Sequence, residues 1–148
     1  MTIVEASVEV DASPERVWEV TSNPVNLPHW DRHIERVWLP SKGLGPGAHY
    51  SIRMRFMAAR SDVQAEVLEW EPPWLARFRL SGILSGTVTT SIASLPFERS
   101  LLRHEVDYTF KGLLGSFAAK SLAAVGGSQL ALRRGILAQK REIESAPS

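Results

Sequence analysis

Hydrophobic and polar residues alternate along short stretches of the first 111 positions. Between residues 50 and 58 every second side chain is apolar, and Ser51, Arg53 and Arg55 lie between them. Successive side chains of a β-strand point to opposite faces, so this pattern predicts strands with one face on a core. Strands are predicted in seven segments, residues 3–10, 34–39, 50–58, 62–70, 74–80, 87–95 and 101–111. Short turns, one of them through Gly82 and Gly86, favour antiparallel neighbours.

Two short helices are predicted directly after the first strand. Ser13 is suited to cap the first helix, and Pro14 is suited to its first position. Asn23 and Pro24 end this helix, because a residue before proline avoids the helical conformation. A second, irregular helix is predicted over residues 25–30.

A single long helix is predicted over residues 112–145. Side chains at steps of three and four residues share one helix face. The positions on this face are Ala118, Leu122, Val125, Gln129, Leu132, Ile136 and Ile143. Such a helix, following a run of strands, is expected to lie across the sheet and cover its apolar face. Gly126 and Gly127 each cost the helix about 1 kcal/mol, which indicates close packing, a kink or a hinge there.

Composition and charge narrow the class of protein. With 148 residues, 44% of them hydrophobic and 22% charged, the chain is expected to form one globular domain, residues 1–148. A net charge of +1 is too balanced for a nucleic-acid partner. The absence of cysteine excludes disulfides and a cysteine nucleophile. No secretion signal or membrane-spanning run is present, so we expect a cytoplasmic protein with no integral membrane association.

The order of these elements and two motifs resemble those of a known superfamily. The first motif is VEVDASPERVW at residues 8–18, followed by Asn23-Pro24, Leu27-Pro28 and Trp30-Asp31. The second is VLEWEPP at residues 67–73. Both resemble the SRPBCC or START-like (Bet v 1-like) superfamily, in its bacterial polyketide cyclase/dehydrase-like branch. These motifs mark a fold and leave the chemistry open.

The resemblance implies an α+β helix-grip fold. In this fold a curved antiparallel sheet of about seven strands wraps around a long C-terminal helix and leaves an apolar cavity between them. We expect a small hydrophobic molecule as the partner and no cofactor. The side chains expected to line the cavity are Trp30, Tyr50, Ile52, Met54, Phe56, Phe78, His104, Val106, Tyr108, Leu122, Val125 and Gln129.

Two of these residues are candidates for catalysis. His104 occupies an inward position of an otherwise apolar strand, where it can bond a ligand or act as an acid or base. Tyr108 also points inward and can orient a ligand carbonyl or hydroxyl. A hydrogen bond to a neighbouring core group is the favoured explanation of His104, and hydrogen bonds within the core explain Tyr108 as well as ligand contact does, so both interpretations stay open.

Three other polar residues need an explanation. Glu69 faces the cavity if its strand continues regularly, but we expect the strand to twist or bulge before Pro72 and Glu69 to face solvent. His29 and His33 have the spacing of a metal site on a regular helix. Pro28 makes that helix irregular and no third ligand lies nearby in the sequence, so we predict no metal. Trp30, with His33, is instead expected at the cavity entrance.

Three functions fit these observations. The first is the binding of a small hydrophobic ligand, such as a lipid, a polyketide-like or an aromatic compound. The second is polyketide cyclase/dehydrase-like catalysis, and the third is a cochaperone-like interaction module. The cavity and the lack of a strong catalytic motif favour the first, whereas the third predicts a filled core and an exposed apolar patch. Monomer and homodimer both remain open.

Overall fold

The structure is a computed structural model that describes residues 2–57, 59–124 and 126–145. Its elements are β1 (Thr2–Val10), α1 (Pro14–Thr21), the 3₁₀ turn η1 (Pro24–Asn26), α2 (Leu27–Trp30), β2 (Ile34–Trp38), β3 (His49–Phe56), β4 (Ala59–Glu71), β5 (Leu75–Gly82), β6 (Leu84–Leu95), β7 (Arg99–Phe110), α3 (Gly112–Ala124) and α4 (Ser128–Ser145). The described strands form a seven-stranded antiparallel sheet in the order β1-β7-β6-β5-β4-β3-β2.

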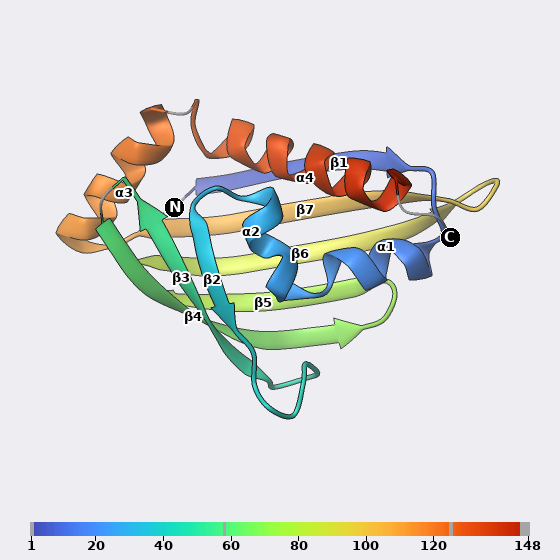
Figure 1. The fold of residues 1–148 in the computed structure, drawn as a ribbon, viewed down its shortest axis with the longest axis horizontal. Coiled ribbons are helices and arrows are strands. Elements are labelled where there is room, and N and C mark those ends of the chain that lie inside the picture. The colour runs from blue at the N-terminus through green and yellow to red at the C-terminus, as the bar shows by residue number, and fades with distance from the viewer. Residues whose placement is uncertain (1, 58, 125, 146–148) are drawn as a thin grey trace.

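The sheet is strongly curved, and α4 runs along β1 on its concave side (Figure 1). The short helices α1 and α2 lie beside α4, and α3 lies at one end of the sheet (Figure 1). This is the α+β helix-grip fold that the sequence predicted, with two short helices after the first strand. None of the helices in the described part of the chain has the length and apolar character needed to cross a membrane.

Alternating burial explains why β3 and β4 are strands. Tyr50, Ile52, Met54 and Phe56 of β3 are buried, and the side chains that alternate with them are at least partly exposed. Val63 and Val67 of β4 are buried among more exposed polar neighbours. Aromatic and β-branched residues therefore cover the concave face, as the alternation predicted.

A β-bulge near the end of β4 determines where Glu69 lies. The register between β4 and β5 shifts between Val67 and Glu69. A bulge adds one residue to a strand, so the side chains beyond it change face. Glu69 is exposed, and its carboxylate lies 3.7 Å from the guanidinium of Arg77. Of the two orientations considered for Glu69, the structure has the one that faces solvent.

The connection between β5 and β6 is shorter than the sequence indicated. A turn was predicted through Gly82 and Gly86, but β5 extends to Gly82 and β6 begins at Leu84. Gly86 therefore lies inside β6, opposite Tyr108 of β7, with a φ of +152°. The prediction failed because glycine serves here for a close approach of two strands rather than for a turn.

The C-terminal helix is two helices, so the prediction of a single helix over residues 112–145 is wrong. Gly126 and Gly127 have φ values of +101° and +90°, which end α3 before α4 begins. The N–H of Gly127 donates to the Leu122 carbonyl over 2.9 Å, as in a Schellman-type helix end. The two glycines thus change the chain direction, and Val125, expected on the cavity face, lies outside the described residues.

The buried side chains form two clusters rather than one continuous core. The first cluster surrounds β3 and β4 and includes Ile52, Phe56 and Val63. The second cluster lies under α4 and includes Leu102 and Ile136. The space between the two clusters is where the candidate site lies.

Candidate functional site

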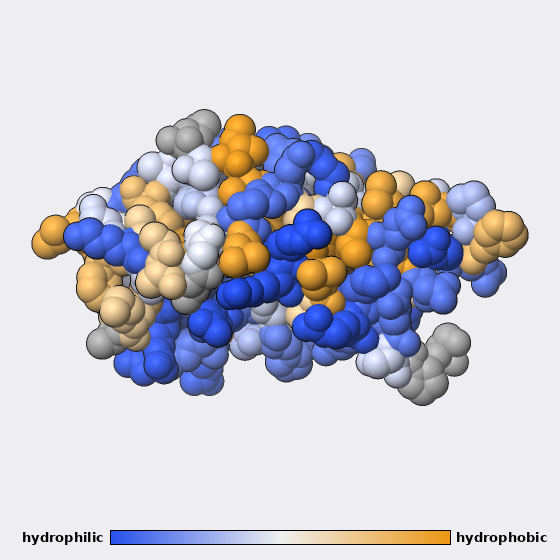
Figure 2. Space-filling view, turned by 90° about the horizontal axis from the view of Figure 1, so that it is seen from above, coloured by the Kyte–Doolittle hydropathy of each residue, from blue (hydrophilic) through white to orange (hydrophobic). Residues whose placement is uncertain are grey.

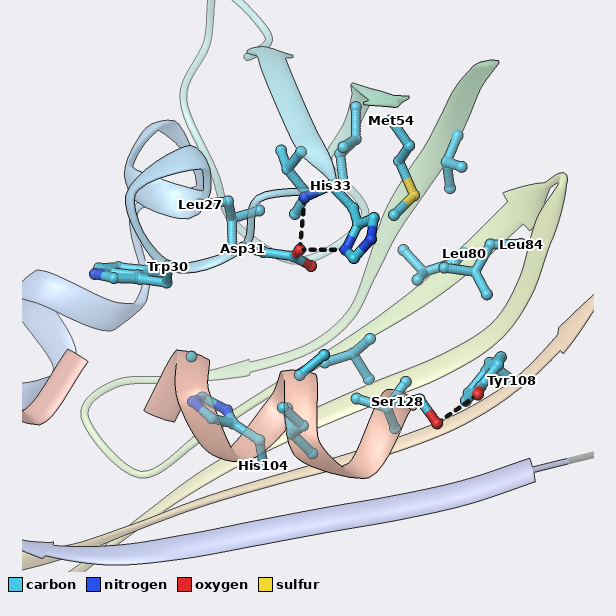
Figure 3. Close-up of a pocket in the computed structure, with 18 of the residues that line it drawn as sticks. Leu27, Trp30, Asp31, His33, Met54, Leu80, Leu84, His104, Tyr108 and Ser128 are labelled. Atoms are coloured by element: carbon cyan, nitrogen blue, oxygen red, sulfur yellow. Dashed lines mark hydrogen bonds and ion pairs between the residues drawn. The ribbon is translucent and has the colours of Figure 1, made fainter. Parts of the chain in front are cut away.

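A pocket of about 260 Å³ separates the two clusters. Its wall is formed by the concave face of the sheet together with α2 and α4 (Figure 3). Most of the lining side chains are apolar and a few are polar, which is the usual composition of a small-molecule pocket. The predicted cavity residues that line it are Trp30, Tyr50, Ile52, Met54, Phe56, Phe78, His104, Val106, Tyr108 and Leu122.

Gln129 does not line the pocket but ties α4 to the edge of the sheet. Its Nε2 donates to the Glu5 carbonyl over 2.7 Å, and its Oε1 accepts from the Glu5 N–H over 3.3 Å. Lys140 donates in the same way to the Glu9 carbonyl over 2.7 Å. β1 is an edge strand, so its backbone groups need partners from outside the sheet. The polar residue that looked like a ligand contact therefore satisfies the backbone of β1.

Both ring nitrogens of His104 are bonded to protein groups. Nδ1 lies 2.8 Å from the Thr90 hydroxyl, and Nε2 lies 2.6 Å from Oε1 of Gln139. With Nε2 donating to the Gln139 oxygen and Nδ1 accepting from Thr90, the neutral ring satisfies all three groups. Burial lowers the pKa of His104, against a smaller raising effect of the Gln139 bond. His104 is therefore held neutral in the pocket wall.

The lowered pKa of His104 makes stability depend on pH. At mildly acidic pH the unfolded chain binds more protons than the folded protein, so the free energy of unfolding rises with pH. The contribution of His104 to the free energy of unfolding is complete above its usual pKa of 6.5. This contribution is lost as the pH falls below that value. Denaturant titrations between about pH 7.5 and about pH 5 measure this change. We expect the free energy of unfolding of His104→Gln to depend less steeply on pH than that of the parent protein.

The control for this titration is His49→Gln, which removes a histidine whose side chain is 70% exposed. This variant is expected to keep the slope of the parent protein. If His104→Gln also kept that slope, the assignment of the pH dependence to His104 would be wrong.

The two pocket tyrosines differ in their hydrogen bonding. The Tyr108 hydroxyl donates to Oγ of Ser128 over 2.6 Å, which links β7 to the start of α4. Tyr50 is 6% exposed and packs edge-on against Phe78 with ring centroids 6.1 Å apart. No described residue bonds its hydroxyl, and burial raises the pKa of this phenol well above its usual value. Tyr50 thus offers a neutral hydroxyl to the pocket.

The pocket also contains an Asp–His pair that the sequence analysis did not assign as a site. Oδ1 of Asp31 accepts the backbone N–H of His33 over 2.8 Å and lies 3.2 Å from its Nδ1 (Figure 3). Both residues line the pocket. A local signal exists, because an Asp side chain often bonds the backbone two residues on. His29 is separate from this pair, since its Nδ1 lies 3.5 Å from Glu142.

The separation of the two histidines follows from the length of α2. This helix ends at Trp30, so His33 is not on the same helix as His29. Among the described residues no group of three or more metal-ligating side chains comes together. Trp30 itself lines the pocket, and its indole N–H donates to Glu142 over 3.0 Å.

Comparisons with solved structures support the architecture. The chain is similar to TTHA0849 from Thermus thermophilus, with a TM-score of 0.76 and 16% identity over 99% of this chain and 100% of that chain. It is similar to the Zhui aromatase/cyclase from Streptomyces sp. R1128, with a TM-score of 0.69 and 18% identity over 97% and 93%. A START superfamily protein from Mycobacterium smegmatis has a TM-score of 0.67 and 17% identity over 96% and 97%. At these identities the likeness shows the fold alone.

A comparison of the sequence with curated proteins finds no match. The family model described as polyketide cyclase/dehydrase and lipid transport matches residues 1–143. That match covers nearly the whole chain, so the protein belongs to the polyketide cyclase/dehydrase and lipid-transport family.

Proposed function

We propose that the protein binds a small, mostly apolar molecule in the pocket between the two clusters. The observation that carries this proposal is the cavity itself, about 260 Å³ between the sheet and α4, walled mainly by apolar side chains. Burying apolar surface contributes about 25 cal/mol per Å², so a ligand that fills such a space gains binding energy without a specific bond. The family description, which includes lipid transport, agrees with this role.

The volume of the pocket limits the size of the ligand. Pockets for drug-sized ligands are typically about 300–1,000 Å³, and this pocket lies just below that range. A compact aromatic or short aliphatic compound therefore fits better than a long acyl chain. Native mass spectrometry of the purified protein and solvent extraction are expected to identify such a molecule.

A cavity-filling variant tests the proposal directly. Val88 of β6 lines the pocket, and Phe in its place would occupy part of the space. We expect Val88→Phe to weaken the binding of the fluorescent apolar probe 8-anilinonaphthalene-1-sulfonate by about tenfold, which corresponds to roughly 1.4 kcal/mol. Equilibrium fluorescence titration measures this change.

The matched control is Thr89→Phe, one residue further along β6. Thr89 is not part of the pocket wall and, by strand alternation, points to the opposite face of the sheet. It is expected to leave probe affinity unchanged. Equal affinities for both variants, or no probe binding by the parent protein, would count against the proposal.

Polyketide cyclase/dehydrase-like catalysis is the second candidate function. Its support is the family match and the presence of His104 and Tyr108 in the pocket wall. Against His104 as an acid or base, both its ring nitrogens already have protein partners. Proton exchange there requires one of these bonds to open, so binding is the better-supported function. Turnover of an identified substrate that His104→Ala left unchanged would remove this candidate.

An interaction module is the third candidate. Apolar and weakly polar residues gather at the end of the molecule formed by α3 (Figure 2). Leu113 is 91% exposed, and Phe117 beside it on α3 is 39% exposed. The interaction hypothesis also requires a filled core, and the pocket argues against that. Pull-down with a defined partner tests it.

Location and assembly are proposals of the same kind. The absence of cysteine fits a reducing compartment, and we propose the cytoplasm. We propose a monomer or homodimer with no nucleic-acid partner, in line with the balanced net charge of +1. Size-exclusion chromatography with light scattering distinguishes the two assembly states.

A further inference from the structure

Asp31 holds the ring of His33 in a fixed position in the pocket wall. One carboxylate oxygen accepts the backbone N–H of His33 and also contacts Nδ1, so backbone and ring are fixed together. The His33 ring also stacks on Phe56, with centroids 5.2 Å apart and planes 28° apart. Only 5% of His33 is exposed. These contacts leave the ring few alternative orientations.

The position of the proton follows from the chemistry of the pair. An ionised carboxylate can only accept hydrogen bonds, so Nδ1 of His33 carries the proton that faces Asp31. In the neutral ring, Nε2 then has a free lone pair. No described residue bonds this nitrogen. The ring extends from Asp31 into the pocket, on the side where Met54 and Leu80 lie (Figure 3).

Among the described residues two histidines line the pocket, His33 and His104, and of these only His33 has a ring nitrogen that no described residue bonds. His104 has Thr90 on one nitrogen and Gln139 on the other. Asp31 is 40% exposed, so solvent still reaches the carboxylate behind the His33 ring. An acceptor in an apolar wall, backed by a solvated carboxylate, is arranged to receive a proton from a ligand.

We propose that Nε2 of His33 is the proton acceptor of the pocket and that it selects apolar molecules that carry a phenol-like hydroxyl. The ligand O–H donates a hydrogen bond to Nε2, and where the hydroxyl is acidic enough its proton moves to Nε2 while its electron pair stays on the ligand oxygen. Asp31 keeps its negative charge and stabilises the imidazolium that forms. The proton returns along the same path, so no other reactant is needed. This inference rests on the proposed function, because it requires a ligand in the pocket.

The probe for this inference is 2-naphthol, with 2-methoxynaphthalene as its matched ether. Excited 2-naphthol is a strong acid, and the naphtholate formed by proton loss emits at longer wavelength than the neutral molecule. Proton loss to water gives the same emission, so a base in the wall is assigned from the difference in this band between the parent protein and the His33 variant. With protein in excess, we expect bound 2-naphthol to show the naphtholate band and to bind about fivefold more tightly than the ether.

Three variants assign the acceptor. His33→Phe keeps an aromatic ring against Phe56 and is expected to abolish both the naphtholate band and the preference for the naphthol. His49→Phe makes the same change on an exposed strand position outside the pocket and is expected to keep both. Asp31→Asn keeps the shape of the side chain and removes its charge, so it is expected to weaken the band even if His33→Phe folds poorly.

The outcomes separate this inference from the proposed function. If the ether binds but the naphthol shows neither preference nor naphtholate emission, the inference fails while the proposed function stands. If the band persists in His33→Phe, or disappears instead in Tyr50→Phe, the acceptor is not His33. If neither probe binds the parent protein, both proposals are overturned.

Discussion

Replacing Gly86 with alanine is expected to lower the free energy of unfolding by about 3 kcal/mol. A Cβ on Gly86 would overlap the carbonyl oxygen of Asp107 and lie 2.8 Å from Cα of Tyr108. These are backbone atoms of the paired strand β7, so they cannot rotate away as a side chain would. The φ of +152° adds strain for any residue with a Cβ. Urea denaturation measures the loss.

The matched control is Gly45→Ala in the loop between β2 and β3. Nothing lies within 4 Å of a Cβ at Gly45, and its φ is outside the range that disfavours other residues. This substitution is expected to be neutral or slightly stabilising, because alanine reduces the entropy of the unfolded chain. A Gly86→Ala protein as stable as Gly45→Ala would mean that β6 and β7 do not approach as closely as the structure has them.

The strands were predictable because burial along strands such as β3 follows a period of two. Ile52 and Val63 face each other across β3 and β4, and both are buried on the concave face. Helix capping was also predictable, because it depends only on residues that are close in sequence. Oγ of Ser13 accepts from the N–H of Arg16 over 3.3 Å, as expected for the N-cap of α1.

The helix break was not predictable from periodicity alone. The apolar spacing of residues 112–145 continues on both sides of the two glycines, so the pattern favoured one helix. Whether Gly126 and Gly127 interrupt a helix depends on their backbone angles, which the spacing of apolar residues does not specify. A single glycine is tolerated in a helix at about 1 kcal/mol, and here both adopt positive φ.

The contacts of the side chains at the site were likewise not predictable from the sequence pattern. The sequence indicated that Gln129 needs a partner, which is correct, but the partner is the backbone of Glu5 on the edge strand. Which strand forms the edge is a property of the whole sheet. His33 was expected only at the entrance, because its contact with Phe56 joins residues 23 positions apart in sequence. Neither contact has a local signature.

Phe56→Ala is expected to lower the free energy of unfolding by about 3 to 5 kcal/mol. Phe56 is 2% exposed and packs edge-on against Phe110, with ring centroids 5.7 Å apart. Truncation removes that contact and leaves a void beside an existing pocket, where few neighbours can move in. Thermal and urea denaturation of the variant measure the cost.

The control with the same chemistry is Phe97→Ala, at the turn between β6 and β7. Phe97 is 93% exposed, so its loss is expected to change stability by no more than about 0.5 kcal/mol. Phe56 also supports the ring of His33, so Phe56→Leu is expected to keep most of the stability while loosening that ring. Similar costs for Phe56→Ala and Phe97→Ala would contradict the placement of Phe56 in the core. They would also remove the rigid support on which the orientation of His33 depends.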